Sequence, residues 1–154
     1  MRRCVLAIIL VLFTFSAQAA TVTSGSLTVT QTKTEPDARL FLNCVTLDWL
    51  SDASGNCTAS LTEINGTIER IVFNPDDGAT SPTAAYDVTL KDVDDVDVLN
   101  GKGANLSASA TTSVVATSTD STTYLPMAAL APLSLAVTNA GASNGGIIRI
   151  YFRR

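Results

Sequence analysis

Apolar and polar residues alternate along most of the chain, and this period of two predicts β-strands with one buried face. One segment, 39–50, is apolar on both faces, as expected of a strand inside a sandwich. No segment carries a sustained apolar stripe at the helical period of 3.6 residues. The pattern predicts about eight strands, at 27–30, 39–50, 57–62, 67–73, 86–91, 113–116, 133–138 and 147–152.

Turn-forming residues separate these strands, where a helical protein would have helix caps. Gly and Asn tolerate a positive φ, and Pro presets a turn. The best candidate for a helix, 126–131, lies between Pro126 and Pro132, which limits it to one short turn. Many short strands with frequent turns favour an all-β fold, a single antiparallel β-sandwich or jelly roll. The turn sequences are Ser54-Gly55-Asn56, Asn65-Gly66, 74–78, Asn100-Gly101 and 144–146.

The first nineteen residues have the composition of a secretory signal peptide. Arg2 and Arg3 precede an apolar run of about a dozen residues, and small residues stand at Ala17 and Ala19. The run is shorter than the roughly 20 residues that a membrane-spanning helix needs. We therefore expect cleavage after Ala19, export to the periplasm or the extracellular space, and no membrane anchor afterwards. The remaining segment, 20–154, has the usual size of one domain.

Cleavage makes the protein more acidic. The full chain has 10 basic and 14 acidic residues, so loss of Arg2 and Arg3 leaves eight against fourteen and a net charge of −6. Nucleic acid is not expected as a partner, because binding to a phosphate backbone depends on clustered Lys and Arg that release counterions. The one basic cluster is Arg149, Arg153 and Arg154. We expect it to flank the last strand.

Export also decides the expected state of the cysteines. Cys44 and Cys57 remain after cleavage, and an even pair in an oxidising compartment predicts a disulfide. On two strands of a hairpin, the bridge would hold the register, and its loop closure would contribute about 3 kcal/mol. A zinc site is not expected, because the chain has no His and two cysteines cannot supply four ligands.

The acidic run 91–101 is the strongest candidate for a cation site. Asp92, Asp94, Asp97 and Asn100 offer oxygen atoms of the kind that calcium binds. Their spacing lacks the turn glycine and the closing glutamate of the helix–loop–helix calcium pattern. A solvated acidic turn between strands is the favoured interpretation, and calcium binding by 92–97 stays open.

No residue pattern in the chain indicates catalysis. The commonest general base, His, is absent, and Lys33, Lys91 and Lys102 stand in no recognisable motif with a serine. The carboxylates of 74–78 belong to a turn, and the sequence supplies no partner across a cleft. Trp49 is a candidate platform for stacking on a sugar, but its strand is apolar on both faces, which favours the core. We expect a protein that is not an enzyme and needs no cofactor.

Four segments in the second half of the chain, 86–92, 97–105, 133–141 and 145–151, consist of strands and Asn- or Gly-containing turns. From about Gly66 onward, these segments resemble small β-rich structural proteins of tailed bacteriophages, found as capsid decoration, head-fibre or tail components. The resemblance covers a little over half of the chain. It implies a β-sandwich that self-associates and has no enzymatic activity.

Three functions without catalysis therefore stay open. The preferred one is an exported structural or assembly protein of virion type, a homo-oligomer or part of a particle or surface assembly, whose terminal strand 147–152 pairs with a neighbour. The second is a secreted module that binds a glycan or a cell surface through its loops, with Trp49 or Tyr124 as the platform. The third is a fimbrial subunit that assembles by strand exchange, which the signal, the cysteine pair and the terminal strand would suit.

Overall fold

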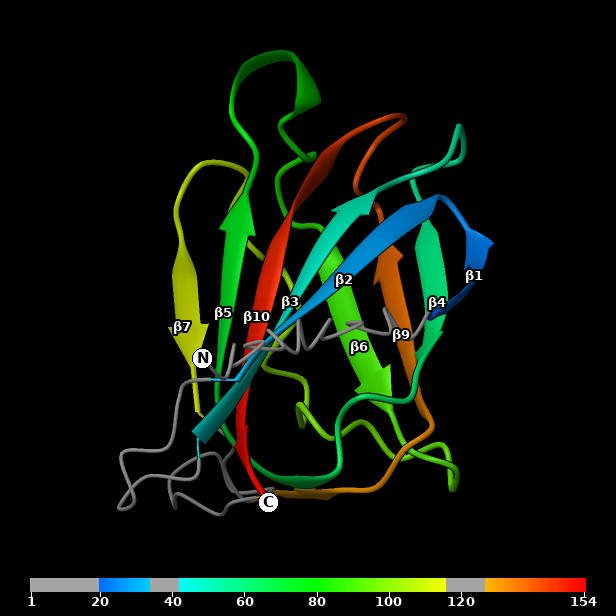
Figure 1. Ribbon diagram of the computed structural model, residues 1–154. Coiled ribbons are helices and arrows are strands. Elements are labelled where there is room, and N and C mark those ends of the chain that lie inside the picture. Colours follow the sequence, from blue (N-terminus) through cyan, green and yellow to red (C-terminus); the bar gives the residue numbers. More distant parts are fainter. Residues whose placement is uncertain (1–19, 34–41, 116–126) are drawn as a thin grey trace, which may run out of the picture.

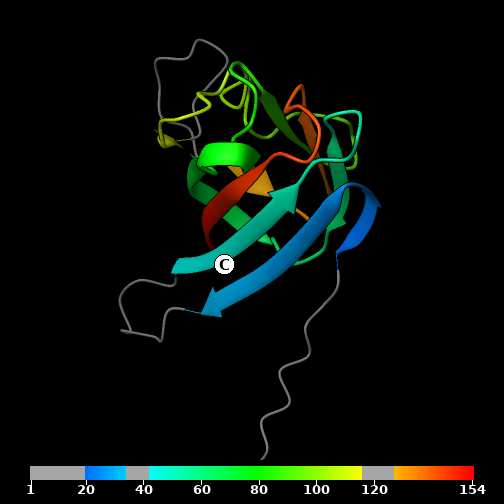
Figure 2. The same cartoon turned by 90° about the horizontal axis from the view of Figure 1, so that it is seen from above.

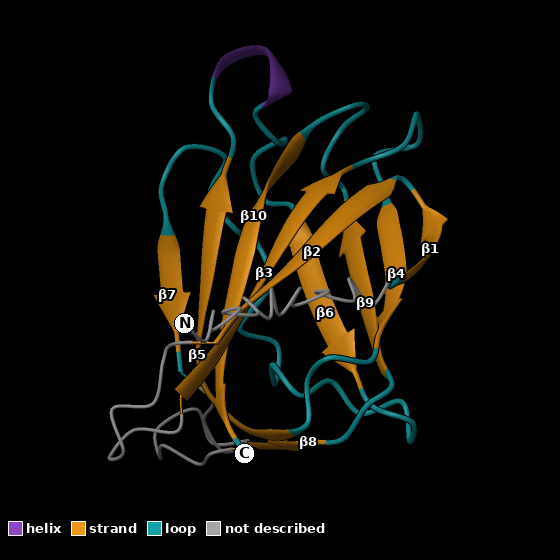
Figure 3. Ribbon diagram, viewed as in Figure 1, coloured by secondary structure: helices purple, strands orange, loops and turns teal. Residues whose placement is uncertain are grey.

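The computed structural model describes residues 20–33, 42–115 and 127–154, and side chains are described for all of these except 31–33. The expected signal peptide at 1–19 lies outside the described residues. Two antiparallel sheets form an all-β sandwich (Figure 1), which confirms the predicted fold class. Within the described ranges the one helical element is a 3-10 turn at Gly78–Thr80, coloured purple in Figure 3. None of these ranges contains a helix long and apolar enough to span a membrane.

Each sheet is assembled from strands that are distant in the sequence. The four-stranded sheet has the order β1-β4-β9-β6, and the main path of the six-stranded sheet is β2-β3-β10-β5-β7, with β8 paired to β5. The strands are β1 (Thr21–Ser24), β2 (Ser26–Lys33), β3 (Leu42–Leu50), β4 (Cys57–Leu61), β5 (Gly66–Pro75), β6 (Asp87–Lys91), β7 (Thr112–Val114), β8 (Met127–Ala129), β9 (Leu133–Thr138) and β10 (Gly145–Arg153).

All eight predicted strands are present, and β1 and β8 are additional. The candidate for a helical turn, 126–131, is not helical over its described residues, because Met127–Ala129 is extended and pairs with the start of β5. Pairing in a sheet supplies these three residues with backbone partners that a single helical turn between two prolines would not provide. Strand β1 has only four residues, too few for alternation to identify.

The chain passes from one sheet to the other at Gly25. Strand β1 pairs with β4 of the four-stranded sheet, and β2 pairs with β3 of the six-stranded sheet (Figures 1 and 2). Gly25 has a φ of +70°, and a Cβ there would lie 2.4 Å from the carbonyl oxygen of Leu50. Only glycine fits this corner, because any side chain would meet backbone at a left-handed φ.

The core lies between the inward faces of the two sheets. Buried and less buried residues alternate along β10, β3 and β4, as the sequence pattern predicted. Trp49 is 2% exposed, which confirms the prediction that it belongs to the core. Burial of a large apolar side chain contributes about 1.5–3 kcal/mol, so these residues are the main source of stability. The largest buried side chains are Trp49, Tyr86, Phe73, Phe152, Leu47, Leu61, Ile64, Ile68, Ile71, Leu90, Leu133 and Leu135.

The predicted disulfide is not formed, and both Cys44 and Cys57 are free thiols. Strands β3 and β4 do not form the expected hairpin, because they belong to different sheets. Cys57 lies near the Leu50 end of β3, where its thiol contacts the carbonyl oxygen of Ser26 at 3.5 Å, and Ser26 pairs with Leu50. Cys44 is six residues away from Leu50 along β3, about 20 Å at the rise of a strand. A disulfide requires Cα atoms within about 7 Å.

This arrangement predicts two thiols of different reactivity. Burial, and secondarily the charge of Asp52, raises the pKa of Cys57 to about 11, whereas Cys44 is only half-buried. Because the thiolate is the reactive form, we expect a maleimide to label Cys44 in the native protein and Cys57 only after unfolding. Peptide mapping by mass spectrometry distinguishes the two sites. Protection of both cysteines until a reductant is added would instead indicate a disulfide.

The terminal strand is also not available for pairing with a neighbour. β10 lies in the interior of its sheet, hydrogen-bonded along its length to β3 on one side and β5 on the other. Both rows of backbone groups already have partners, so the expected pairing of 147–152 with another chain is wrong. Any contact that β10 makes with a partner must use its side chains.

Candidate functional site

The acidic run after β6 forms a turn, as predicted, and two of its carboxylates hold that turn together. Asp92 Oδ1 accepts hydrogen bonds from the backbone N–H groups two and four residues later, both at 3.0 Å. Asp97 accepts three backbone hydrogen bonds, at 3.2, 3.1 and 2.9 Å. Asp95 is solvent-exposed and pairs with Lys91 at 2.9 Å. In the part of the chain that the structure describes, no three Cys, Asp or Glu side chains gather as metal ligands.

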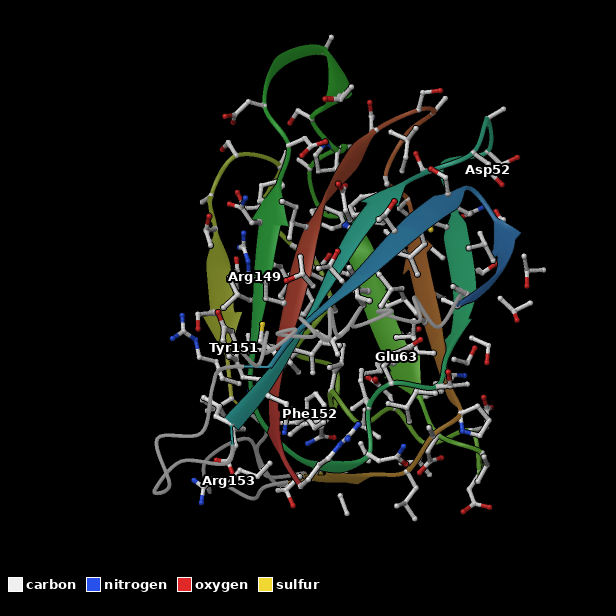
Figure 4. The ribbon with its side chains drawn as sticks, in the orientation of Figure 1. Asp52, Glu63, Arg149, Tyr151, Phe152 and Arg153 are labelled. Atoms are coloured by element: carbon white, nitrogen blue, oxygen red, sulfur yellow. The ribbon has the colours of Figure 1, made fainter. Side chains whose placement is uncertain are left out.

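Asp52 connects two loops at one end of the sandwich. Its carboxylate accepts hydrogen bonds from the Ser24 hydroxyl and from the backbone N–H groups of Ser54 and Asn56, at 2.8 and 3.0 Å. The Ser24 hydroxyl, followed by these N–H groups, holds the pKa of Asp52 below its usual value of 3.8. Because Ser24 ends β1 of one sheet and Asp52 follows β3 of the other, the carboxylate links the two sheets at this end of the sandwich (Figure 4).

The lowered pKa gives Asp52 a pH-dependent effect on stability. A carboxylate with a depressed pKa stabilises the fold above its unfolded-state pKa, and this stabilisation is lost as the pH falls through the lower, folded-state pKa. We expect Asp52→Asn to unfold at a lower urea concentration than the wild type at neutral pH, with a gap that narrows below pH 3.8. Urea denaturation across this range measures the gap, and Asp94→Asn is the control. If the difference in urea midpoint between the wild type and Asp52→Asn does not change with pH, the ionisation of Asp52 does not stabilise the fold.

A further set of side chains, which belong neither to the core nor to these turns, lies on the solvent-facing side of the six-stranded sheet. Alternation along the strands directs every second residue away from the core. Figure 4 shows Arg149, Tyr151 and Arg153 following one another down β10 on this face. We use the term outer face for Cys44, Thr46, Asp48, Leu50, Arg70, Asn74, Asp76, Ile147, Arg149, Tyr151 and Arg153.

The lower half of the outer face is basic. Arg70 lies over the ring of Tyr151, with 5.5 Å from its guanidinium carbon to the ring centroid, and Arg70 Nε donates to Ser113 Oγ at 2.9 Å. Arg153 forms an ion pair with Glu69 at 3.1 Å. Arg149 is paired in register with Thr46 on one side and Val72 on the other, and no described acidic group forms an ion pair with it.

The upper half of the same face is acidic. Asp48 projects from β3, and Asp76 follows β5, where a Cβ added to Gly145 would lie 2.9 Å from Asp76 Oδ2. Burial, followed by the charges of Asp48 and Asp77, raises the pKa of Asp76. Asp48 and Asp77 therefore lie close enough to Asp76 to disfavour its charged form, in addition to the effect of burial. The two carboxylates of the 74–78 turn, Asp76 and Asp77, therefore have a third neighbour, Asp48, from another strand.

The C-terminal arginines, predicted to flank the last strand, are divided between two environments. Arg149 and Arg153 lie within β10 on the outer face, whereas Arg154 Nη2 donates to the carbonyl oxygen of Glu63 at 3.2 Å. The guanidinium of Arg154 also lies 5.8 Å from the centroid of the Phe152 ring. Alternation over 147–152 was the signal that places Arg149 and Tyr151 on one face, but Asp48 and Asp76 reach that face only through strand pairing.

Of the two aromatic residues considered for sugar stacking, only Trp49 lies in the part of the chain that the structure describes. Trp49 is buried in the core, and Tyr124 lies outside the described residues. Tyr151, half-buried beside Arg70, is the aromatic ring on the outer face. Comparisons with protein-family models, with curated proteins and with solved structures found no match.

Proposed function

We propose that the protein is a non-catalytic structural or assembly protein, exported and self-associating, of the kind found in virions. The outer face of the six-stranded sheet is the single observation that carries this proposal. On it, Leu50 is 39% exposed, Ile147 and Tyr151 are half-buried, and Arg149 has no ion-pair partner among the described residues. Aromatic residues and Arg are the types enriched at protein interfaces.

The roles of the other polar groups support the same function. The carboxylates of Asp52, Asp92 and Asp97 accept hydrogen bonds from the backbone, so they stabilise turns. The phage resemblance of the second half of the chain points in the same direction. Self-association through β10 would use its side chains on the outer face, since β10 itself has no free edge.

A second candidate function is binding of an anionic glycan on a cell surface. Arg70, Arg149 and Tyr151 lie close together in the basic half of the outer face, and guanidinium groups bind sulfate and carboxylate well. The acidic half, with Asp48 and Asp76, would repel the rest of an extended polyanion. For this reason the assembly role is preferred.

Size-exclusion chromatography with light scattering tests the proposed function. The full chain is expressed with its own leader and purified as the cell processes it. We expect a mass above that of one chain, increasing with concentration between about 1 and 100 μM, the range in which moderately tight complexes form. A single-chain mass throughout this range contradicts self-association.

A further inference from the structure

We infer that the outer face of the six-stranded sheet docks on the same face of a second copy of this chain, around a two-fold axis that crosses the strands. This rests on the proposed self-association and names the surface and the contacts that would produce it. The distribution of charge identifies a second copy as the partner, because a half-turn places the basic half of the face over the acidic half of an identical face.

Strand pairing defines the rows of side chains across this face. Ile148 pairs with Leu47 of β3 and with Phe73 of β5, and these three inward residues form a row across the middle of the sheet. On the outer face, Arg149 and Arg70 lie on one side of this row. Asp48 and Asp76 lie on the other.

A two-fold axis above the middle row exchanges positions at equal distances on either side of it. Arg70 and Asp76 are each three residues from Phe73 along the chain, so the half-turn places Arg70 over Asp76 of the second copy. Arg149 falls over the second copy's Ile147, and the adjacent β3 carries Asp48 at that level. Arg149 and the second copy's Asp48 are therefore offset sideways by one strand spacing, about 4.8 Å, which an arginine side chain can span.

The Arg70–Asp76 contact and the Arg149–Asp48 contact thus each occur twice in the dimer, once in each direction, as an isologous interface requires. The pairing also accounts for two groups that lack a balancing charge within one chain. Among the described residues, neither Arg149 nor Asp76 forms an ion pair, and Asp48 and Asp77 lie near Asp76. Arg153 is already paired with Glu69 and adds little to the charge of the face.

The size and composition of the face suit a dimer. The main path of the sheet has five strands, and β3 and β10 have nine residues each. Standard strand dimensions then give a face about 19 Å wide across the strands and about 30 Å long. A typical interface buries about 800 Å² of accessible surface on each partner, which is comparable. Ile147 lies beside Asp48, Leu50 is the next outward residue after Asp48, and Tyr151 is the next after Arg149. In the dimer these apolar groups would exclude water from the neighbouring ion pairs.

Charge reversal with mixing tests this contact. We expect Arg149→Glu and Asp48→Lys each to weaken self-association of the full chain by 10-fold or more, because each places like charges together in both symmetric contacts. An equimolar mixture of the two variants should recover wild-type affinity within about 3-fold, since its heterodimer pairs Glu with Lys and Arg with Asp. Analytical ultracentrifugation measures both.

The mixture also separates this contact from other effects of the substitutions. Arg149 and Asp48 are diagonal neighbours within one chain. A double variant would therefore restore opposite charges within each chain as well as between chains. The mixture of single variants restores opposite charges only between chains. Arg70→Glu with Asp76→Lys is the second pair, and circular dichroism confirms the fold of each variant. A variant pair that does not fold is replaced by the other.

Three results would overturn the inference. If the wild type self-associates but both single variants associate equally well, the outer face is not the contact and the proposed function still stands. If the wild type is monomeric at all concentrations, the inferred contact and the proposed self-association are both wrong. If the monomer instead binds heparin through Arg149 and loses that binding in Arg149→Glu, the face is a polyanion site.

Discussion

Replacing Trp49 by alanine is expected to lower the free energy of unfolding by about 3–5 kcal/mol. Whole domains of this size have a stability of only about 5–15 kcal/mol, so the loss would leave the protein marginally folded. Trp49 is 2% exposed on β3, and its ring lies 5.7 Å from the ring of Tyr86 with a tilt of 38°. Because Tyr86 immediately precedes β6 of the other sheet, this ring pair connects the two layers.

The burial of Tyr86 adds to the cost of losing this contact. Tyr86 is 2% exposed, and this burial raises the pKa of its phenol to about 12. Removal of the indole leaves a cavity beside this ring, and the lost contacts add to the lost hydrophobic transfer. The conservative change Trp49→Phe keeps part of the ring contact and should cost less.

Urea denaturation followed by far-ultraviolet circular dichroism measures the effect of Trp49→Ala. Fluorescence does not suit the variant, because Trp49 is the only tryptophan in the chain. Leu130→Ala is the control, since Leu130 is 69% exposed and its truncation should change stability by no more than about 0.5 kcal/mol. Equal losses in Trp49→Ala and Leu130→Ala would show that the ring pair does not hold the sheets together.

Alternation was sufficient to predict the strands because a strand with one buried face repeats every two residues. Along β10, for example, Ile148, Ile150 and Phe152 point inward and Arg149 and Tyr151 outward, as the pattern of 147–152 indicated. The same reasoning correctly placed Trp49 in the core. It failed at Met127–Ala129, where backbone pairing with β5, a long-range contact, decides the conformation.

Sequence separation alone was misleading for the cysteines. A separation of thirteen positions from Cys44 to Cys57 suggested a hairpin, but the loop after β3 carries the chain into the other sheet. Local turn residues do not reveal such a crossing, because the same Gly and Asn suit a hairpin and a crossover. The charged outer face was equally hidden, since Asp48, Arg70 and Arg149 meet only after three distant strands have paired.

Replacing Gly66 by alanine is the second change with a large expected effect, about 3 kcal/mol or more, from backbone strain and steric overlap together. Gly66 has a φ of +144°, which residues with a Cβ rarely adopt. A Cβ at this position would lie 1.8 Å from the carbonyl oxygen of Arg153. The obstacle is backbone of β10, so no rotation of a side chain can relieve it.

Gly101→Ala is the matched control that separates the two causes. Gly101 also has a positive φ, +75°, but no atom lies within 4 Å of its Cβ position. It should therefore show only the cost of a left-handed conformation, about 1–2 kcal/mol. The excess loss in Gly66→Ala, measured by urea denaturation of both variants, reports the close approach of β5 to the end of β10. Equal losses would mean that the start of β5 can move away from Arg153, and that the register at this end of the sheet is not held by the glycine.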